Sequence, residues 1–216
     1  MKINCISGIQ YDSNIYIIDG EIPTIIDCGT GLNQKYVDDK IKQTINPLKI
    51  QQIILTHEHF DHCGGAKNIL DLTNKKAKIL SHNNAAEKIE GGDSYFARML
   101  GGYMPKINID YKIKDNENVT IGDEKFQIIH TPGHSPGCIC MYNKKNKILF
   151  SGDTIFAYGS FGRYDFPGGK LSELKQSIKK ISKLDIENLY PGHESFIEGN
   201  AQLHINKTLE NITNMI

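Results

Sequence analysis

Short apolar runs open the chain and predict a series of β-strands. Glycine or proline separates these runs, which cover residues 2–6, 14–19 and 24–27. From residue 33 to 45 the apolar positions recur at helical spacing, and Pro47 ends the pattern. A buried-type strand follows at 52–55. The first quarter of the chain therefore predicts an antiparallel meander, one helix and a further strand.

The rest of the chain alternates helical and extended patterns. Helices are predicted at 66–72, 171–184 and 201–215, and strands at 77–80, 119–121, 125–129, 138–142, 147–150 and 186–190. Residues 87–112 hold two glycine pairs around a short apolar stretch, which we interpret as a mobile flap or lid helix. Strands followed by helices in each half predict an α/β fold, a four-layer αββα sandwich formed by a single domain over residues 1–216.

Charge and hydropathy indicate which kinds of binding partner to expect. The 25 basic residues balance 25 acidic ones without long runs of one sign, which argues against nucleic acid or anionic lipid as a partner. The amino terminus lacks a signal-peptide pattern, and no apolar run approaches the roughly 20 residues that span a bilayer. We therefore expect a cytoplasmic protein that acts on a small molecule, without a membrane partner, and leave a homodimer open.

The cysteines form neither a disulfide framework nor a zinc knuckle. Their number is odd and no CxxC pair occurs, so we expect reduced thiols at Cys5, Cys28, Cys63, Cys138 and Cys140. Small buried side chains are the expected role for these residues. Cys63 stands out because it directly follows His62.

Three histidines and one aspartate lie within six residues, directly after the predicted strand at 52–55. They are His57, His59, Asp61 and His62, in the segment THEHFDH. Imidazole nitrogen and carboxylate oxygen are ligands that zinc and similar divalent metals accept. Alternation along an extended loop places His57 and His59 on one side and turns Glu58 away from them. The segment predicts a metal site, against the alternative of a solvated loop in which Asp61 caps the following helix.

One loop cannot complete two coordination spheres, so further ligands are expected at the ends of other strands. Three candidates follow predicted strands and lie among small residues: His134 in TPGHSPG, Asp153 in SGDT and His193 in PGHE. The remaining histidines are His82, His130 and His204. We expect structural roles for His82 and His130, with support of the ligand histidines as the alternative, and a surface position for His204 on the terminal helix.

These four motifs, in this order, resemble those of the metallo-β-lactamase superfamily over residues 14–194. The resemblance implies two divalent metal ions and seven ligands: His57, His59 and His134 on the first ion, Asp61, His62 and His193 on the second, and Asp153 bridging both. It further implies that Asp27, at the end of an early strand, orients a ligand histidine. Zinc is the expected metal, with iron or manganese as alternatives.

The loop that follows Asp153 narrows the family further. Its segment GRYDFPGG, residues 162–169, looks like the GRxDxPGG loop of the glyoxalase II-like, or hydroxyacylglutathione hydrolase-like, branch. That likeness implies hydrolysis of a thioester by a metal-bound hydroxide, with Asp61 as the catalytic residue. A basic residue of this loop contacts an anionic part of the substrate in that branch, so Arg163 and Tyr164 are candidate substrate-binding residues. A structural salt bridge from Arg163 to Asp165 is the alternative.

Two departures leave glutathione itself open as the substrate. Hydroxyacylglutathione hydrolases continue into a helical region that grips glutathione, whereas only 23 of the 216 residues follow His193 here. Tyr164 also stands where the loop of that branch usually has threonine.

Other reaction classes remain as alternatives. Persulfide dioxygenases have a similar loop and bind one iron through the equivalents of His57, His134 and Asp153. A hydrolase of another ester, a lactone or a phosphodiester would use the same metal centre, and a scaffold that binds metal without catalysis is a third class. The neutral charge argues against RNA, and the Arg163 loop argues against a β-lactamase. Metal content and oxygen consumption would separate the two enzyme classes.

Overall fold

The computed structural model describes residues 1–92 and 95–215, and the chain divides into two compact units. The first unit holds Met1–Ile113 and Thr120–Lys125, and the second holds Lys114–Val119 and Phe126–Ile216. The single domain expected over residues 1–216 stays a prediction. Within the described part of the chain, no helix is long and apolar enough to cross a membrane.

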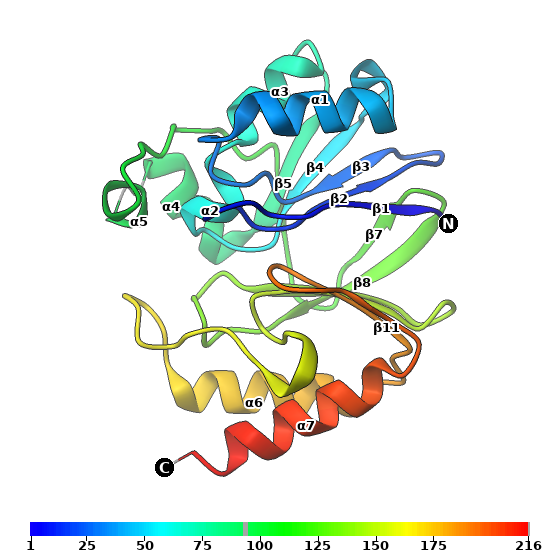
Figure 1. Ribbon diagram of the computed structural model, residues 1–216, viewed down its shortest axis with the longest axis vertical. Coiled ribbons are helices and arrows are strands. Elements are labelled where there is room, and N and C mark those ends of the chain that lie inside the picture. Colours follow the sequence, from blue (N-terminus) through cyan, green and yellow to red (C-terminus); the bar gives the residue numbers. More distant parts are fainter. Residues whose placement is uncertain (93–94, 216) are drawn as a thin grey trace. The chain divides into compact units, whose positions relative to one another are not determined.

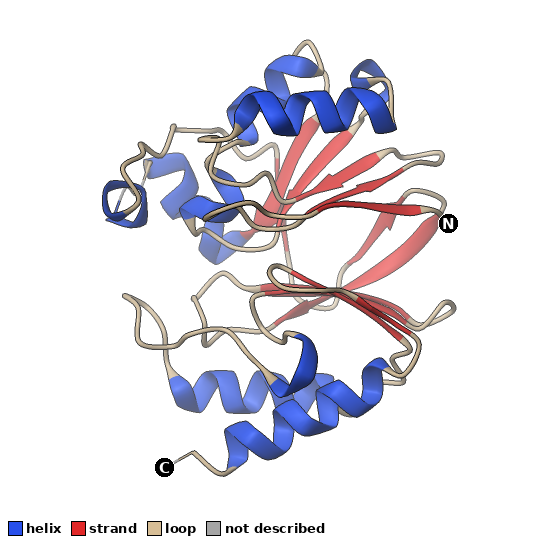
Figure 2. Cartoon of the chain, viewed as in Figure 1, coloured by secondary structure: helices blue, strands red, loops and turns tan. Residues whose placement is uncertain are grey.

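The first sheet has six strands in sequence order, β1 to β6 (Figures 1 and 2). They are β1 Ile3–Ile6, β2 Ile15–Ile18, β3 Thr24–Ile26, β4 Gln52–Leu55, β5 Lys78–His82 and β6 Tyr111–Ile113. The first three strands form the predicted antiparallel meander, and β3 to β6 run parallel. Because β4 lies between two parallel neighbours, its carboxyl end is at the sheet edge where such folds place functional loops.

Helices that bury a few apolar residues each accompany this sheet. They are α1 Gln34–Thr44, α2 Phe60–Cys63, α3 Ala66–Leu72, α4 Asn83–Gly91 and α5 Tyr95–Met99, with a short 3₁₀ helix at Pro47–Lys49. In Figure 1, α1 and α3 lie along the same face. Ile41 and Ile69 from these helices are fully buried with Ile53 of β4 in one core. Burial of each such side chain contributes roughly 1.5–3 kcal/mol to the free energy of folding. The core therefore fixes the position of β4 and of the loop that follows it.

The region predicted as a flap or lid helix holds two helices. The first, α4, begins at Asn83, before the predicted boundary, and ends at Gly91, where Gly92 caps it in the left-handed conformation. The second, α5, contains the predicted apolar stretch. Residues 93–94 of the predicted flap lie outside the described residues.

The second sheet also has six strands, in the order β12-β11-β10-β9-β8-β7. They are β7 Asn118–Ile121, β8 Glu124–His130, β9 Ile139–Asn143, β10 Ile148–Gly152, β11 Asn188–Pro191 and β12 Ile197–Glu198. Strands β10 and β11 are parallel, whereas β9 is antiparallel to both β8 and β10. A 3₁₀ helix covers Ala157–Gly159, and α6 Leu171–Ile181 and α7 Ala201–Thr213 pack together (Figure 1). Leu174 and Ile178 of α6 share a core with Ile205 of α7.

Candidate metal centre

The first set of candidate ligands follows β4. This first ligand set comprises His57, His59, Asp61 and His62. Strands β3 and β4 are parallel neighbours, so the residues after them, Asp27 and Thr56, meet at one sheet edge. Asp27 accepts hydrogen bonds from the Thr56 backbone N–H and the Thr56 hydroxyl, both at 2.8 Å. The loop is thereby anchored to the neighbouring strand before the first histidine.

Asp27 also orients His62, as expected from the sequence. Its Oδ2 lies 2.8 Å from His62 Nδ1, and both side chains are buried. A carboxylate can only accept, so His62 donates through Nδ1–H and carries its lone pair on Nε2. That nitrogen lies 3.8 Å from Asp61 Oδ2. Asp27 itself has φ 58°, a left-handed conformation in which aspartate is several times more frequent than most other residues.

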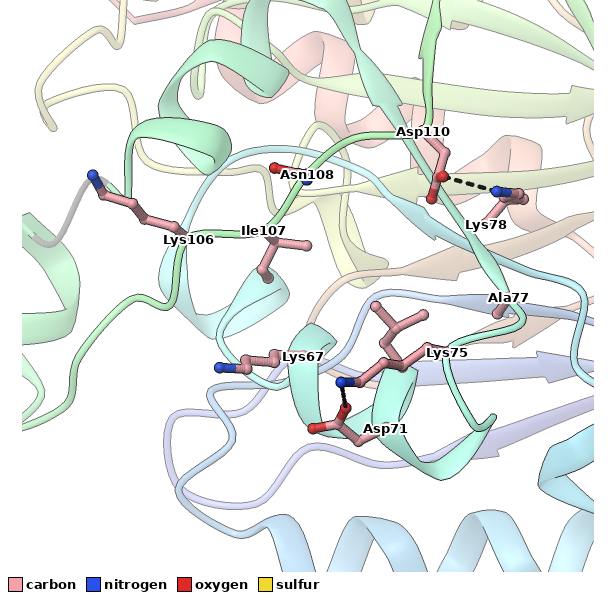
Figure 3. A pocket seen from close by; sticks show the side chains of 10 residues that line it. Lys67, Asp71, Lys75, Ala77, Lys78, Lys106, Ile107, Asn108 and Asp110 are labelled. Carbon is pink, nitrogen blue, oxygen red and sulfur yellow. Dashed lines mark hydrogen bonds and ion pairs between the residues drawn. The ribbon is translucent and has the colours of Figure 1, made fainter.

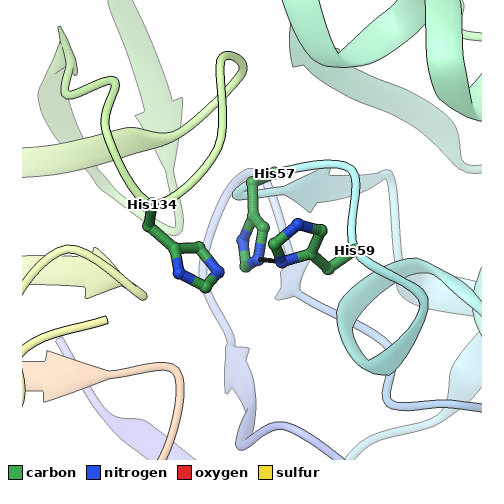
Figure 4. A group of neighbouring side chains, drawn as sticks. All are labelled: His57, His59 and His134. Atoms are coloured by element: carbon green, nitrogen blue, oxygen red, sulfur yellow. Dashed lines mark hydrogen bonds between the residues drawn. The ribbon is translucent and has the colours of Figure 1, made fainter. Parts of the chain in front are cut away.

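His57 is held in the same tautomer. Its Nδ1 lies 3.1 Å from Thr56 Oγ1, whose hydroxyl proton is given to Asp27. The Thr56 oxygen therefore accepts from His57 Nδ1–H, which leaves the lone pair on Nε2. Figure 4 shows that nitrogen facing His59 Nδ1, at 3.1 Å. His57 and His59 thus turn ring nitrogens toward one another, as the alternation predicted.

Glu58 faces a different neighbour from the two histidines that flank it. Its buried carboxylate lies 3.3 Å from Lys88 Nζ of α4. This ion pair agrees with the expectation that Glu58 is turned away from the ligands. It also ties residues 56–62, which we call the metal-binding loop after its candidate ligands, to α4.

The second set of candidate ligands comes from three loops of the second unit. This second ligand set comprises His134 after β8, Asp153 after β10 and His193 after β11. Strands β10 and β11 are parallel, which brings Asp153 and His193 to the same sheet edge. Asp153 Oδ2 lies 3.6 Å from His193 Nε2 and 3.5 Å from His134 Nε2. The second set is thus gathered around one carboxylate.

A backbone carbonyl orients His134. Its Nδ1–H donates to the carbonyl oxygen of Arg163 at 2.6 Å, so Nε2 again carries the lone pair. Gly162, just before Arg163, leaves no room for a side chain: a Cβ there would lie 1.9 Å from the Asp153 carbonyl oxygen and 2.9 Å from His134 Nδ1. The Gly162-Arg163 backbone therefore packs directly against two candidate ligands. Sequence reasoning missed this role, although the glycine was a usable signal.

The two candidate substrate-binding residues have other contacts in this structure. Arg163 pairs with Asp165 through two hydrogen bonds of 2.9 and 2.7 Å, and its guanidinium lies 4.3 Å from the Phe166 ring centre. Its side chain is 65% exposed, and it lowers the pKa of Asp165. Tyr164 is half-buried against the core of the second unit. The structure thus shows the salt bridge weighed as the alternative for Arg163, and substrate binding by either residue stays a prediction.

The other histidines serve the fold, as expected. His82 Nδ1 accepts from the Asn84 N–H and caps α4, and His130 Nε2 donates to the Pro136 carbonyl. His204 accepts from the Tyr158 N–H. The cysteines are free thiols, as predicted, and Cys63 donates to the His57 carbonyl. The Cys63 side chain is buried, and burial raises the pKa of its thiol well above the usual range.

A cavity of about 330 Å³ lies elsewhere in the first unit (Figure 3). It is lined by four lysines and two aspartates, among other residues: Lys67, Lys75, Lys78, Lys106, Asp71 and Asp110. Asp71 and Asp110 pair with Lys75 and Lys78. None of the candidate ligands lines this cavity, so it is not the metal site.

The donor sets fit divalent metal ions. All seven candidate residues offer imidazole nitrogens or carboxylate oxygens. Three of the four donor separations within the sets, at 3.5, 3.6 and 3.8 Å, exceed hydrogen-bond length. Ligands about 2.0–2.1 Å from a tetrahedral ion are separated by roughly 3.3 Å, so the spacing suits metal ligands better than hydrogen-bonded partners.

The family model of the metallo-β-lactamase superfamily matches residues 8–193. Because this match covers most of the chain, the chain belongs to the metallo-β-lactamase superfamily. TTHA1623, solved in a di-iron-bound form, is similar to it with a TM-score of 0.76, 29% sequence identity and coverage of 98% of each chain. The predicted α/β class and metallo-β-lactamase fold are thereby confirmed.

Two curated relatives carry functional names. A probable metallo-hydrolase of Methanocaldococcus jannaschii is 33% identical over 201 residues, which cover 89% of this chain and 91% of that protein. A hydroxyacylglutathione hydrolase of Maricaulis maris is 31% identical over 154 residues, which cover 71% of this chain and 51% of that protein. The match thus spans about half the length of that hydrolase. The family includes hydrolases, and the predicted resemblance to the glyoxalase II-like branch is confirmed at modest identity.

Proposed function

We propose that the two ligand sets together hold two divalent cations and that the protein is a metal-dependent hydrolase of thioesters. In this proposal His57, His59 and His134 bind one ion, Asp61, His62 and His193 bind the other, and Asp153 bridges them. Membership of the superfamily supports this assignment. Zinc is the proposed metal, and iron or manganese would suit the same nitrogen and oxygen donors.

One observation carries the proposal. The Nδ1–H groups of three candidate ligands each face an oxygen acceptor: Thr56 Oγ1 for His57, Asp27 Oδ2 for His62 and the Arg163 carbonyl for His134. Such partners hold metal-binding histidines in one tautomer and raise the basicity of the other nitrogen. In all three histidines the lone pair is therefore on Nε2, the nitrogen that can bind a metal. Histidines with a purely structural role would not require the same tautomer in all three cases.

The chain's own residues then have distinct tasks. Asp61, partly exposed beside His62, offers its carboxylate oxygen both as a ligand and as the group that orients the attacking water. The bound ions would acidify that water and polarise the carbonyl of the substrate. Asp153, buried within reach of His134 and His193, supplies a shared negative charge. A thioester is supported by the likeness to the hydroxyacylglutathione hydrolase of Maricaulis maris and by the GRYDFPGG loop.

Elemental analysis and a thioester assay test this proposal together. We expect close to two zinc, or mixed zinc and iron, per chain and cleavage of S-lactoylglutathione or another acyl thioester. His59→Ala should lose metal and activity, whereas His204→Ala, a histidine on α7, should retain both. One iron per chain with persulfide-dependent oxygen uptake would overturn the proposal. Metal at two per chain with cleavage of esters or phosphodiesters alone would overturn the thioester assignment.

A further inference from the structure

Helix α5 presents apolar side chains to solvent next to the metal-binding loop. Tyr95 is 44% exposed and Met99 is 63% exposed, four residues apart and so on one face of the helix. Phe96 between them is half-buried against the core of the first unit. Arg98 is the single charged residue of this helix. Tyr95 and Met99 therefore form a small exposed apolar surface on this helix.

Phe96 connects this surface to a candidate metal ligand. Its ring centre lies 4.4 Å from that of His59, with the planes tilted by 55°. Tyr95 packs edge-on against Phe96, with ring centres 5.1 Å apart. A group bound near His59 would therefore reach the Phe96 and Tyr95 rings within a few carbon atoms.

Two further contacts fix the helix in this place. Helix α5 packs against α2, the helix that begins directly after His59. The chain after α5 also rests on the Phe60 ring, because a Cβ at Gly102 would lie 2.5 Å from it. The α5 surface is thus fixed to α2 by the helix itself and to Phe60 by the chain on its carboxyl side.

We propose that Phe96, with Tyr95 and Met99 beside it, forms the wall that binds the acyl group and selects substrates with an apolar acyl chain. The inference rests on the proposed hydrolase function. Burial of methylene groups against these side chains provides the selectivity. A lactoyl group, which is short and polar, would gain little from this wall. The preferred substrate is therefore an acyl thioester with a longer apolar chain.

A binding experiment tests the wall without catalysis. The protein is loaded with cobalt(II), and the charge-transfer absorbance of bound alkanethiols from ethanethiol to octanethiol gives their affinities. We expect affinity to rise up to about fourfold for each added methylene until the chain passes the wall. In Phe96→Ala this rise in affinity with chain length should disappear, and in Phe96→Leu it should persist. Tyr36→Ala removes an aromatic residue from α1, away from the proposed wall, and serves as the control.

Kinetics on acyl thioesters of two to ten carbons then separate the two proposals. The wall predicts that kcat/KM rises with chain length through KM, and that Phe96→Ala flattens the rise while its cobalt content stays normal. If kcat/KM rose equally with chain length in wild type and Phe96→Ala, or did not rise in wild type, the proposed wall would be overturned. The proposal of thioester hydrolysis would be unaffected. Chain-length-dependent thiol binding without thioester cleavage would keep the wall and overturn the proposed reaction. Loss of a dimer in Phe96→Ala, with unchanged thiol affinities, would assign the surface to self-association instead.

Discussion

The two ligand sets are built in different ways. The first comes from one continuous segment after β4, and side chains orient it: Asp27 holds His62 and Thr56, and Thr56 holds His57. The second comes from three separate loops, and backbone orients its His134: the Arg163 carbonyl holds the ring, and Gly162 permits the close approach.

The difference teaches where each set is vulnerable. A set that side chains orient fails when a carboxylate or hydroxyl is removed. A set that backbone orients tolerates side-chain truncation but not the addition of a Cβ atom. The following predictions test this contrast, beginning with the largest effect.

Asp27→Ala is expected to have the largest effect. It removes the acceptor of three buried donors: the Thr56 N–H, the Thr56 hydroxyl and His62 Nδ1–H. We expect a loss of about 3–5 kcal/mol in the free energy of unfolding, measured by urea denaturation. Metal affinity should fall at least about 10- to 100-fold, as it does when the partner of a ligand histidine is lost. Asp27→Asn keeps the shape and tolerates the positive φ, so its loss should be smaller; equal losses would mean that charge plays no part.

Gly162→Ala should break the second set through the backbone. The new Cβ would overlap the Asp153 carbonyl and press on His134, so the loop must shift away from both ligands. We expect a loss of about 1–3 kcal/mol and reduced metal content, measured by denaturation and elemental analysis. Gly91→Ala is the matched control, because no atom lies within 4 Å of a Cβ at that position in α4. Normal metal content in Gly162→Ala would show that the close packing is not needed.

Lys88→Met tests the ion pair between Lys88 and Glu58, which lies within the segment that carries the first ligand set. This contact is more exposed to solvent than the hydrogen bonds of Asp27. The substitution removes the ammonium beside the buried Glu58 carboxylate, while the methionine keeps most of the apolar stem. We expect a loss of about 1–2 kcal/mol, since Lys88 is itself partly solvated. The double variant Lys88→Met with Glu58→Gln should recover part of that loss. No recovery would mean that the pair contributes through packing alone.

Arg163→Ala should have the smallest effect on the metal centre, because the carbonyl and not the guanidinium holds His134. Metal content should equal that of the wild type. Arg163 lowers the pKa of Asp165, so the contribution of this pair is present above the ordinary aspartate pKa and is lost as pH falls through the lowered value. The variant should therefore differ from wild type slightly at neutral pH and not at strongly acidic pH, by denaturation midpoints. A raised KM with normal metal content would support substrate binding by Arg163, and loss of metal would contradict the carbonyl's role.

Strands near the ligands could be predicted because their sequence pattern is simple. The apolar run at 52–55 became β4, and the runs before Asp153 and His193 became β10 and β11. Helix α4 was not predicted as a helix of its own, because its sequence, NNAAEKIEG, has two asparagines at its start and only three buried positions. Strand β6, with three residues, is too short for a periodic pattern.

Contacts between distant parts of the chain were harder to predict. The His134 bond to the Arg163 carbonyl joins residues 29 positions apart, and it depends on the path of a loop rather than on side-chain type. The contact between the Phe96 and His59 rings likewise depends on how α5 packs, and not on the hydrophobic pattern of the segment itself. The contact of Asp27 with a ligand histidine was predicted from the resemblance to the superfamily, and the parallel pairing of β3 and β4 accounts for it.

Anomalous diffraction at the metal absorption edge tests the central claim most directly. The account predicts two peaks per chain, about 3.5–4 Å apart. One should be bound by His57, His59 and His134, the other by Asp61, His62 and His193, with Asp153 between them. A single peak, or two peaks that each contact only one ligand set, would contradict a centre built jointly from both sets.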